Sequence, residues 1–142
     1  MKAIILAAGR SSRLYPITWN SPKCLLEIGE KTIIEHQISW LKKCGINDVL
    51  VVHGYLYHKI EEVLGSSVRY RHYGKYSETN NLYTLSSVVD ELSEDLVILF
   101  SDVLLSVKLL RSCIESTFDS CLIVDRKNIS DTTMFVRIEK RK

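Results

Sequence analysis

The sequence lacks the features that mark several common classes of protein. Proline occurs only twice and glycine six times among 142 residues, and the chain shows no internal repeat, low-complexity tract or linker. The formal net charge is only +2, which is too small to indicate DNA or another polyanion as a partner. No apolar run approaches the ~20 residues that a membrane-spanning helix needs, and the apolar start at residues 3–8 has no signal-peptide cleavage pattern. We therefore expect a globular protein with no nucleic-acid partner and no membrane span.

Disulfide and metal-binding patterns are missing as well. The four cysteines lie far apart without a C-x-x-C pair, and the four histidines show no metal-ligand spacing. Because no secretory signal is visible, we expect reduced thiols in a cytoplasmic protein, where cysteine packs as a small hydrophobic residue. The histidines are expected to be structural or solvated. The residues concerned are Cys24, Cys44, Cys113, Cys121, His36, His53, His58 and His72.

What the chain does contain is the composition and apolar patterning of one α/β domain. Hydrophobic residues make up 46% and charged residues 25%, as in ordinary globular domains, and we take residues 1–142 as a single domain. Short apolar runs alternate with segments of helical periodicity. This alternation predicts a mainly parallel central sheet with helices on both faces. Strands are expected at 2–7, 48–53, 68–73, 96–100, 121–124 and 133–138, and helices at 32–44, 57–64, 81–92 and 107–116.

The loop after the first expected strand carries the clearest functional pattern. Residues 7–9 are small, so a ligand can approach the backbone closely, and Gly9 can adopt positive φ without steric cost. Two serines and two arginines follow at 10–13, and Lys23 comes after Pro22. Exposed amides, hydroxyls and guanidiniums together suit a phosphate, although the same residues also fit a polar surface loop. The candidate nucleotide-binding residues are Leu6, Ala7, Ala8, Gly9, Arg10, Ser11, Ser12, Arg13 and Lys23.

The spacing of this loop matches neither a Rossmann dehydrogenase nor a P-loop ATPase, because the chain has no G-x-G-x-x-G and no G-x-x-x-x-G-K-[ST]. It resembles instead the signature of sugar-phosphate-type nucleotidyltransferases, with LAAGxxSRL at residues 6–14 and SPK at 21–23. The usual loop has a second glycine where this chain has Ser11. The resemblance implies a Rossmann-like nucleotidyltransferase fold in which this loop wraps a triphosphate and Arg13 and Lys23 act as catalytic, phosphate-contacting residues.

Asp102 is the candidate metal ligand. It follows the strongly apolar run 96–100, so we expect its carboxylate at the carboxyl end of a buried central strand, over the ligand cleft. Taken alone, an aspartate after a strand is also a common turn or helix-capping residue. In the resembled family an aspartate at this place coordinates Mg²⁺ between the nucleotide and the acceptor phosphate. The resemblance therefore implies Mg²⁺ as cofactor and a catalytic role for Asp102.

Asn80 and Asn81 are the candidate base-reading residues. An asparagine offers a donor and an acceptor, which suits the edge of a nucleobase, but residues 79 and 80 also fit the N-cap of the helix expected at 81–92. The stretch TNNLYTL at 79–85 resembles the T-N-N-x-Y-[ST]-L segment of the choline-phosphate cytidylyltransferase branch, including its phosphonate-using relatives. The resemblance implies CTP as the nucleotide, and His53-Gly54-Tyr55 resembles the family's V-x-G-Y element.

Two further residues are assigned to the acceptor side of the cleft. Asp125 ends the strand expected at 121–124 in a run that resembles a V-D-K element of the family, although it also fits an ordinary strand-end carboxylate. Tyr83 is one of several tyrosines expected to pack in the core, one of which could offer an aromatic face to a choline-like cation.

The resemblance covers nearly all of this chain but only the amino-terminal part of the family domain. This predicts a fragment, a natural truncation or a site completed by a partner chain, with an exposed sheet edge that favours a homo-oligomer. Three functions stay open: transfer of CMP from CTP to a small phosphorylated or phosphonate acceptor, a sugar-1-phosphate nucleotidyltransferase using another nucleoside triphosphate, and a catalytically idle nucleotide-binding or assembly module.

Overall fold

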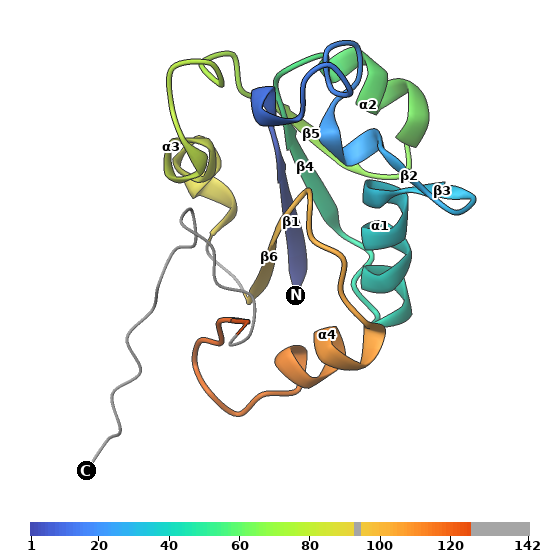
Figure 1. The fold of residues 1–142 in the computed structure, drawn as a ribbon. Helices are drawn as coiled ribbons and strands as arrows, with labels where there is room; N and C mark the ends of the chain where they lie inside the picture. The colour runs from blue at the N-terminus through green and yellow to red at the C-terminus, as the bar shows by residue number, and fades with distance from the viewer. Residues whose placement is uncertain (93–94, 126–142) are drawn as a thin grey trace.

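The computed structural model describes residues 1–92 and 95–125, which form a parallel sheet with helices on both faces (Figure 1). The sheet has the strand order β5-β4-β1-β6, and its three neighbouring pairs are all parallel. A separate antiparallel hairpin joins β2 and β3. The strands are β1 (Lys2–Ala7), β2 (Glu27–Ile28), β3 (Lys31–Thr32), β4 (Val49–His53), β5 (Arg69–His72) and β6 (Leu96–Phe100).

The helices begin and end where local capping chemistry allows. In α1, Thr32 and Glu35 form a reciprocal capping box at the N-terminus, and Gly45 follows the C-cap with φ of 83°. No helix in the described ranges combines the length and the apolar composition needed to cross a bilayer. The α-helices are α1 (Ile33–Lys43), α2 (Tyr57–Leu64), α3 (Asn81–Ser86) and α4 (Val107–Ile114), and the 3-10 turns are η1 (Ser12–Leu14), η2 (Lys23–Leu25) and η3 (Val89–Glu91).

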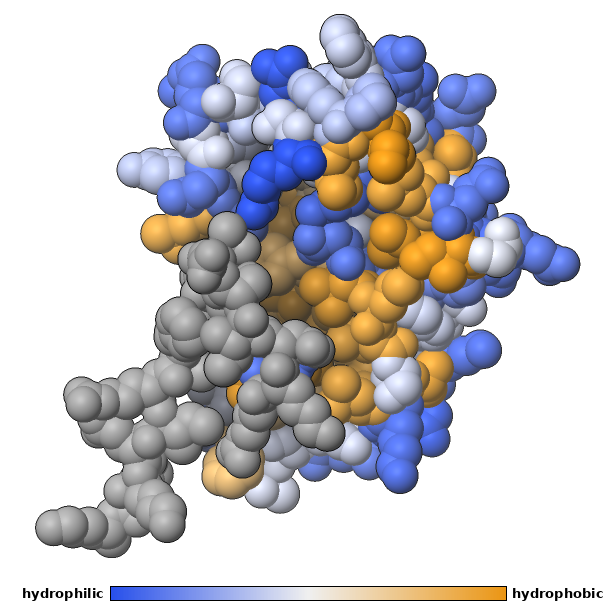
Figure 2. Space-filling view, in the orientation of Figure 1, coloured by the Kyte–Doolittle hydropathy of each residue, from blue (hydrophilic) through white to orange (hydrophobic). Residues whose placement is uncertain are grey.

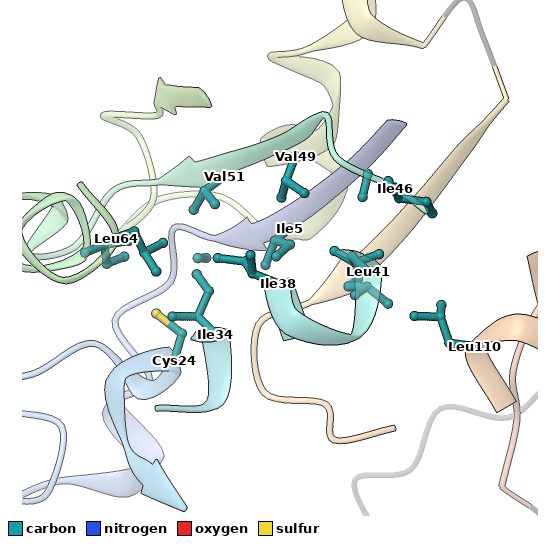
Figure 3. Close-up of a cluster of buried hydrophobic side chains, with 14 residues drawn as sticks. Ile5, Cys24, Ile34, Ile38, Leu41, Ile46, Val49, Val51, Leu64 and Leu110 are labelled. Atoms are coloured by element: carbon teal, nitrogen blue, oxygen red, sulfur yellow. The ribbon is translucent and has the colours of Figure 1, made fainter. Parts of the chain in front are cut away.

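The larger core lies between the sheet and α1, α2 and α4. Alternate residues of β1, such as Ile5, meet Ile34 and Leu41 of α1, while Leu64 of α2 and Leu110 of α4 close the cluster (Figure 3). Burial of such aliphatic side chains contributes roughly 1.5–3 kcal/mol each. Packing of the buried face of α1 against the sheet therefore stabilises this side of the fold.

The opposite face of the sheet is covered less completely. Ile4 and Leu6 pack against Val88 between α3 and η3, but Ile98 and Phe100 of β6 are 40% and 47% exposed. In Figure 2 exposed hydrophobic residues gather in the middle and right of the view, over the β6 edge of the sheet and towards α1 and α4. The expectation that 96–100 is a buried central strand is therefore wrong for the described chain: β6 is an edge strand, buried mainly on the α1 side.

Two other predictions differ from the structure. The helix expected at 81–92 is split into α3 and η3, because Ser86 and Ser87 bond back to the carbonyls of Tyr83 and Thr84 and such bonds compete with helix propagation. No strand forms at 121–124, since an apolar run becomes a strand only where a sheet edge receives it. The strand expected at 133–138 lies outside the described residues.

The topology decides where a ligand can bind. After β1 the chain builds β4 and then β5 on one side, and it crosses back to place β6 on the other side of β1. Register pairs Ala7 with His53 and Leu6 with Phe100, so the carboxyl ends of β1, β4 and β6 meet at one edge. In open parallel sheets the crevice at such a reversal is the usual ligand site.

Candidate nucleotide site

Close backbone packing fixes the start of the loop after β1. Ala8 is buried, and its carbonyl accepts a hydrogen bond of 2.9 Å from the Tyr55 amide in the loop after β4. A Cβ atom on Gly54 would lie 2.9 Å from that carbonyl and 2.6 Å from a ring carbon of Tyr76. Only glycine at position 54 therefore lets these two loops approach each other so closely.

The left-handed residue of the loop is Ser11 rather than Gly9. Ser11 has φ of 53° and ψ of 40°, whereas Gly9 is not among the glycines with positive φ. The Ser11 carbonyl accepts from the Leu14 amide at 3.0 Å and from the hydroxyl of buried Thr18 at 2.9 Å. These two bonds hold a conformation that serine rarely adopts, at the place where the resembled signature usually has glycine.

An open cleft of about 410 Å³ lies beside this turn. The Arg10 guanidinium sits 5.7 Å from the centre of the Tyr55 ring, at a cation–π distance. Exposed Arg13 has no ion-pair partner in the described part of the chain, so its charge is available to an anion. The cleft is lined by Arg10, Ser11, Ser12, Tyr15, Tyr76 and Ser77.

Lys23 and Asp102 meet although they are far apart in sequence. Lys23 Nζ donates to Asp102 Oδ2 at 2.5 Å. The backbone at Lys23 is anchored because the next residue, Cys24, is buried in the larger core. This burial also raises the pKa of the Cys24 thiol to about 12. Asp102 follows β6 directly after buried Ser101. The two residues predicted to contact phosphate and metal are thus joined at the carboxyl edge of the sheet.

The structure gives Asn80 a structural task. Its side-chain oxygen accepts from the Leu82 amide at 3.0 Å and caps α3, which is the alternative that the sequence left open. Its side-chain nitrogen makes no hydrogen bond to any described residue, and Asn81 and Tyr83 are exposed. A base-reading role for Asn80 and Asn81 and an acceptor role for Tyr83 remain predictions.

Asp125 is the last residue of the described segment that follows α4. In Figure 1 the orange-to-red segment after α4 lies at the end of the view where the chain begins, opposite the carboxyl ends of β1 and β4. The assignment of Asp125 to the acceptor side remains a prediction that gains no support from the fold.

His53 ends β4 and is buried with a mixed environment. Its Nε2 lies 2.9 Å from Glu61 Oε1, and the rings of Tyr57 and Tyr70 pack near it at 5.3 and 5.5 Å. Burial lowers the pKa of His53, and the contact with Glu61 offsets part of that effect. These contacts fit the structural role expected for the histidines.

Sequence reasoning missed residues that shape the site from other elements. Tyr76 is one of the tyrosines expected to be packing residues, of which one was expected to be able to line an acceptor pocket, and it forms a wall of the cleft. Gln37, on the buried face of α1, bonds to the turn that carries Asp102. The signal that could have identified it is a polar residue within the apolar stripe of a helix. A larger hollow of about 510 Å³ is lined by residues of α1 and α2, and none of the predicted site residues lines it.

Comparisons with known proteins agree with this geometry. A family model described as the MobA-like NTP transferase domain matches residues 3–132. The chain is 46% identical over 101 residues to choline-phosphate cytidylyltransferase of Streptococcus pneumoniae, covering 69% of this chain and 43% of that protein. It is 35% identical over 135 residues to CTP:phosphoglutamine cytidylyltransferase of Campylobacter jejuni, covering 89% and 53%. The chain thus spans about half the length of these curated relatives.

Solved structures give the same result. CTP:phosphocholine cytidylyltransferase of Streptococcus pneumoniae superposes with a TM-score of 0.67 at 41% identity, over 71% of this chain and 44% of that one. A putative glucose-1-phosphate thymidylyltransferase of Bacillus anthracis reaches 0.72 at 32% identity, over 81% and 49%. By sequence, fold and the loop after β1, this chain belongs to the MobA-like NTP transferase domain family.

Proposed function

We propose that the protein transfers CMP from CTP to a small phosphorylated or phosphonate acceptor and releases pyrophosphate. The observation that carries the proposal is the juxtaposition of Lys23 and Asp102 at 2.5 Å, beside a loop with the family signature. The two relatives described above are both named cytidylyltransferases, and the name of the second includes CTP, which favours CTP over other nucleotides.

The proposed chemistry needs no covalent protein intermediate. An oxygen of the acceptor phosphate attacks the α-phosphorus of CTP, and the bond from that phosphorus to the β-phosphate oxygen breaks in line. Because the acceptor is already an anion, positioning and charge neutralisation supply most of the catalysis. Arg13 and Lys23 would offset the charge of the triphosphate and of departing pyrophosphate, while the amides around Ser11 bind its oxygens.

The residues present fit a magnesium ion in a limited way. Asp102 offers one partly exposed carboxylate, and no cluster of three or more metal-binding side chains occurs in residues 1–92 and 95–125. This suits Mg²⁺, which usually takes one or two carboxylates and fills its other positions with water and substrate phosphates. Asp102 would hold the ion, which when bound would supply positive charge that offsets the charge of the phosphates. In this structure the Lys23 ammonium is bonded to the Asp102 carboxylate. We infer that substrate binding draws the ammonium towards phosphate and frees the carboxylate.

A release assay tests the proposal. Pyrophosphate release would be measured in the presence of Mg²⁺ for each of five nucleotides: CTP, UTP, GTP, ATP and dTTP. Each nucleotide would be paired with phosphocholine, a phosphonate analogue or glucose 1-phosphate as the acceptor. We expect release only with CTP and a non-sugar acceptor. Release with dTTP or UTP and glucose 1-phosphate would instead establish the sugar-nucleotide activity that the Bacillus anthracis neighbour's description suggests. CTP binding without release from any acceptor would indicate an idle binding module.

Replacement of Lys23 gives the sharper prediction. Lys23→Ala should lower turnover by two or more orders of magnitude, because it removes a cation that stabilises developing charge, while the fold survives loss of a partly exposed ion pair. The matched control is Lys42→Ala on the exposed side of α1, which should leave turnover unchanged. Wild-type pyrophosphate release by Lys23→Ala would remove Lys23 from the mechanism.

A further inference from the structure

Gln37 is a polar residue on the buried face of α1. It is 1% exposed and shares that face with Ile34, Ile38 and Leu41. A buried amide is unfavourable unless its groups are hydrogen-bonded. The position therefore calls for partners. The side-chain nitrogen finds them on a segment far away in sequence, whereas Oε1 is buried without a hydrogen-bond partner among the described residues.

The side-chain nitrogen of Gln37 bonds to two backbone carbonyls. Nε2 donates to the Phe100 carbonyl at 2.8 Å and to the Val103 carbonyl at 2.7 Å. Since both partners are acceptors, the orientation of the amide is fixed with its nitrogen towards them. The two carbonyls flank Asp102, so a single amide group clamps both sides of the turn that presents this carboxylate.

The same helix also holds the other half of the ion pair. The Ile33 amide, at the start of α1, donates to the Leu26 carbonyl at the end of η2 at 3.0 Å. Cys24 of η2 is in the same buried cluster as Ile34. Helix α1 therefore makes two contacts. Its first turn contacts η2, which carries Lys23, and its Gln37 contacts the turn after β6, which carries Asp102.

We propose that Gln37 is a positioning residue that sets the Asp102 carboxylate against Lys23 and the metal-bound nucleotide. This inference rests on the function proposed above, because it assumes that Asp102 is the metal ligand. Groups that orient a ligating side chain have large effects on metal affinity when they are lost, typically 10–100-fold. Gln37 fills that role through the backbone on both sides of Asp102.

The test measures Mn²⁺ binding to the protein in the presence of CTP, with electron paramagnetic resonance as the readout. Gln37→Met keeps the length and the apolar packing but removes both hydrogen bonds. We expect its Mn²⁺ dissociation constant to rise about tenfold or more. Ile38→Ala is the control: it opens a cavity in the same helix and lowers thermal stability at least as much, but it should leave Mn²⁺ affinity unchanged.

Further variants separate the possible failures. If Asp102→Asn binds Mn²⁺ and CTP like the wild type, the metal role in the proposed function is wrong. If Asp102→Asn loses Mn²⁺ but Gln37→Met does not, only the positioning role is wrong. If Gln37→Met and Ile38→Ala weaken Mn²⁺ binding equally, Gln37 acts through stability alone, which also overturns the inference.

A measurement on the unmodified protein covers the case in which Gln37→Met does not fold. The side-chain amide protons of Gln37 should exchange slowly with solvent and should resist exchange as long as the turn at residues 100–103 stays closed. Fast exchange, typical of a solvated glutamine, would contradict the clamp without any substitution.

Discussion

Ser11 shows how one residue shapes the phosphate-binding turn. A left-handed conformation costs a non-glycine residue about 1–2 kcal/mol, and strain of this kind gathers at ligand-binding positions. The Thr18 hydroxyl and the Leu14 amide, both bonded to the Ser11 carbonyl, hold the turn in place. The chain therefore keeps the geometry of a glycine turn while adding a hydroxyl to the cleft.

Substitution of Ser11 should reveal that strain. Ser11→Gly should stabilise the protein by about 0.5–1 kcal/mol, because relief of the left-handed cost exceeds the extra freedom of glycine in the unfolded chain. Ser11→Val should destabilise it by about 1 kcal/mol or more, since a β-branched residue fits positive φ poorly. Urea unfolding of both variants measures the difference. Equal stability of the two would show that residue 11 is not left-handed in solution.

Several elements are joined at the amino end of the sheet by one network of charges. Arg69 of β5 bonds to Glu91 of η3 at 2.7 Å and to Asp48 before β4 at 2.8 Å, and Lys2 of β1 bonds to Glu91 at 3.0 Å. Two cations lower the pKa of Glu91 to about 2, Arg69 contributing first and Lys2 second. The carboxylate of Glu91 thus holds the η3 side of the fold to the starts of two strands.

Glu91→Gln should destabilise the protein by about 2 kcal/mol at pH 7, because charge-assisted hydrogen bonds are lost. The folded pKa of about 2 lies below the ordinary value of 4.5, so this stabilisation is complete above pH 4.5 and disappears as the pH falls towards 2. The stability difference between variant and wild type should narrow over the same range. Unfolding free energies measured at pH 7, 4.5 and 3 test this.

The control for the network is Asp90→Asn. Among the described residues Asp90 pairs with Arg71 alone, and its side chain is 60% exposed. An exposed pair contributes about 0–1 kcal/mol. A loss of stability for Asp90→Asn as large as that for Glu91→Gln would show that charge in this region matters generally and that the network has no special role.

At the scale of the whole molecule, the described residues by themselves bring the parts of the binding edge together. The signature loop, Lys23, Asp102 and α1 all belong to one packed unit around β1. The exposed face of β6, in contrast, has no complete cover among the described residues. We therefore predict that nucleotide binding can be separated from complete catalysis. The expected homo-oligomer also remains a prediction, for size-exclusion chromatography.

CTP with Mg²⁺ should stabilise the chain even if turnover is absent. A ligand at 100 times its dissociation constant adds about 2.7 kcal/mol to folding stability, which corresponds to a rise in Tm of about 10 °C for a domain of this size. ATP and GTP at the same concentration should raise Tm less. Differential scanning calorimetry measures the shifts, and equal shifts with all nucleotides would contradict selection of CTP.

Much of this architecture was predictable from local pattern. The runs that became β1, β4 and β5 and the periodicity of α1 and α2 were expected almost to the residue, because alternation, continuous apolar runs and helical periodicity are local patterns. Prediction failed where tertiary contacts decide. The hairpin of β2 and β3 is too short to leave a pattern, and the break between α3 and η3 depends on serine side chains and on Val88 packing against the sheet.

The sequence by itself determined the loop after β1, the parallel α/β plan and the family, since these follow from residue types at fixed spacing. Only the tertiary structure decided that Lys23 and Asp102 are partners, 79 positions apart, and that Gln37 bonds to the turn that carries Asp102. It also placed the positive φ at Ser11 rather than at Gly9 and made β6 an edge strand of the described sheet. The physical reason is that spacing along the chain fixes local conformation, whereas the meeting of distant side chains depends on how helices and strands pack.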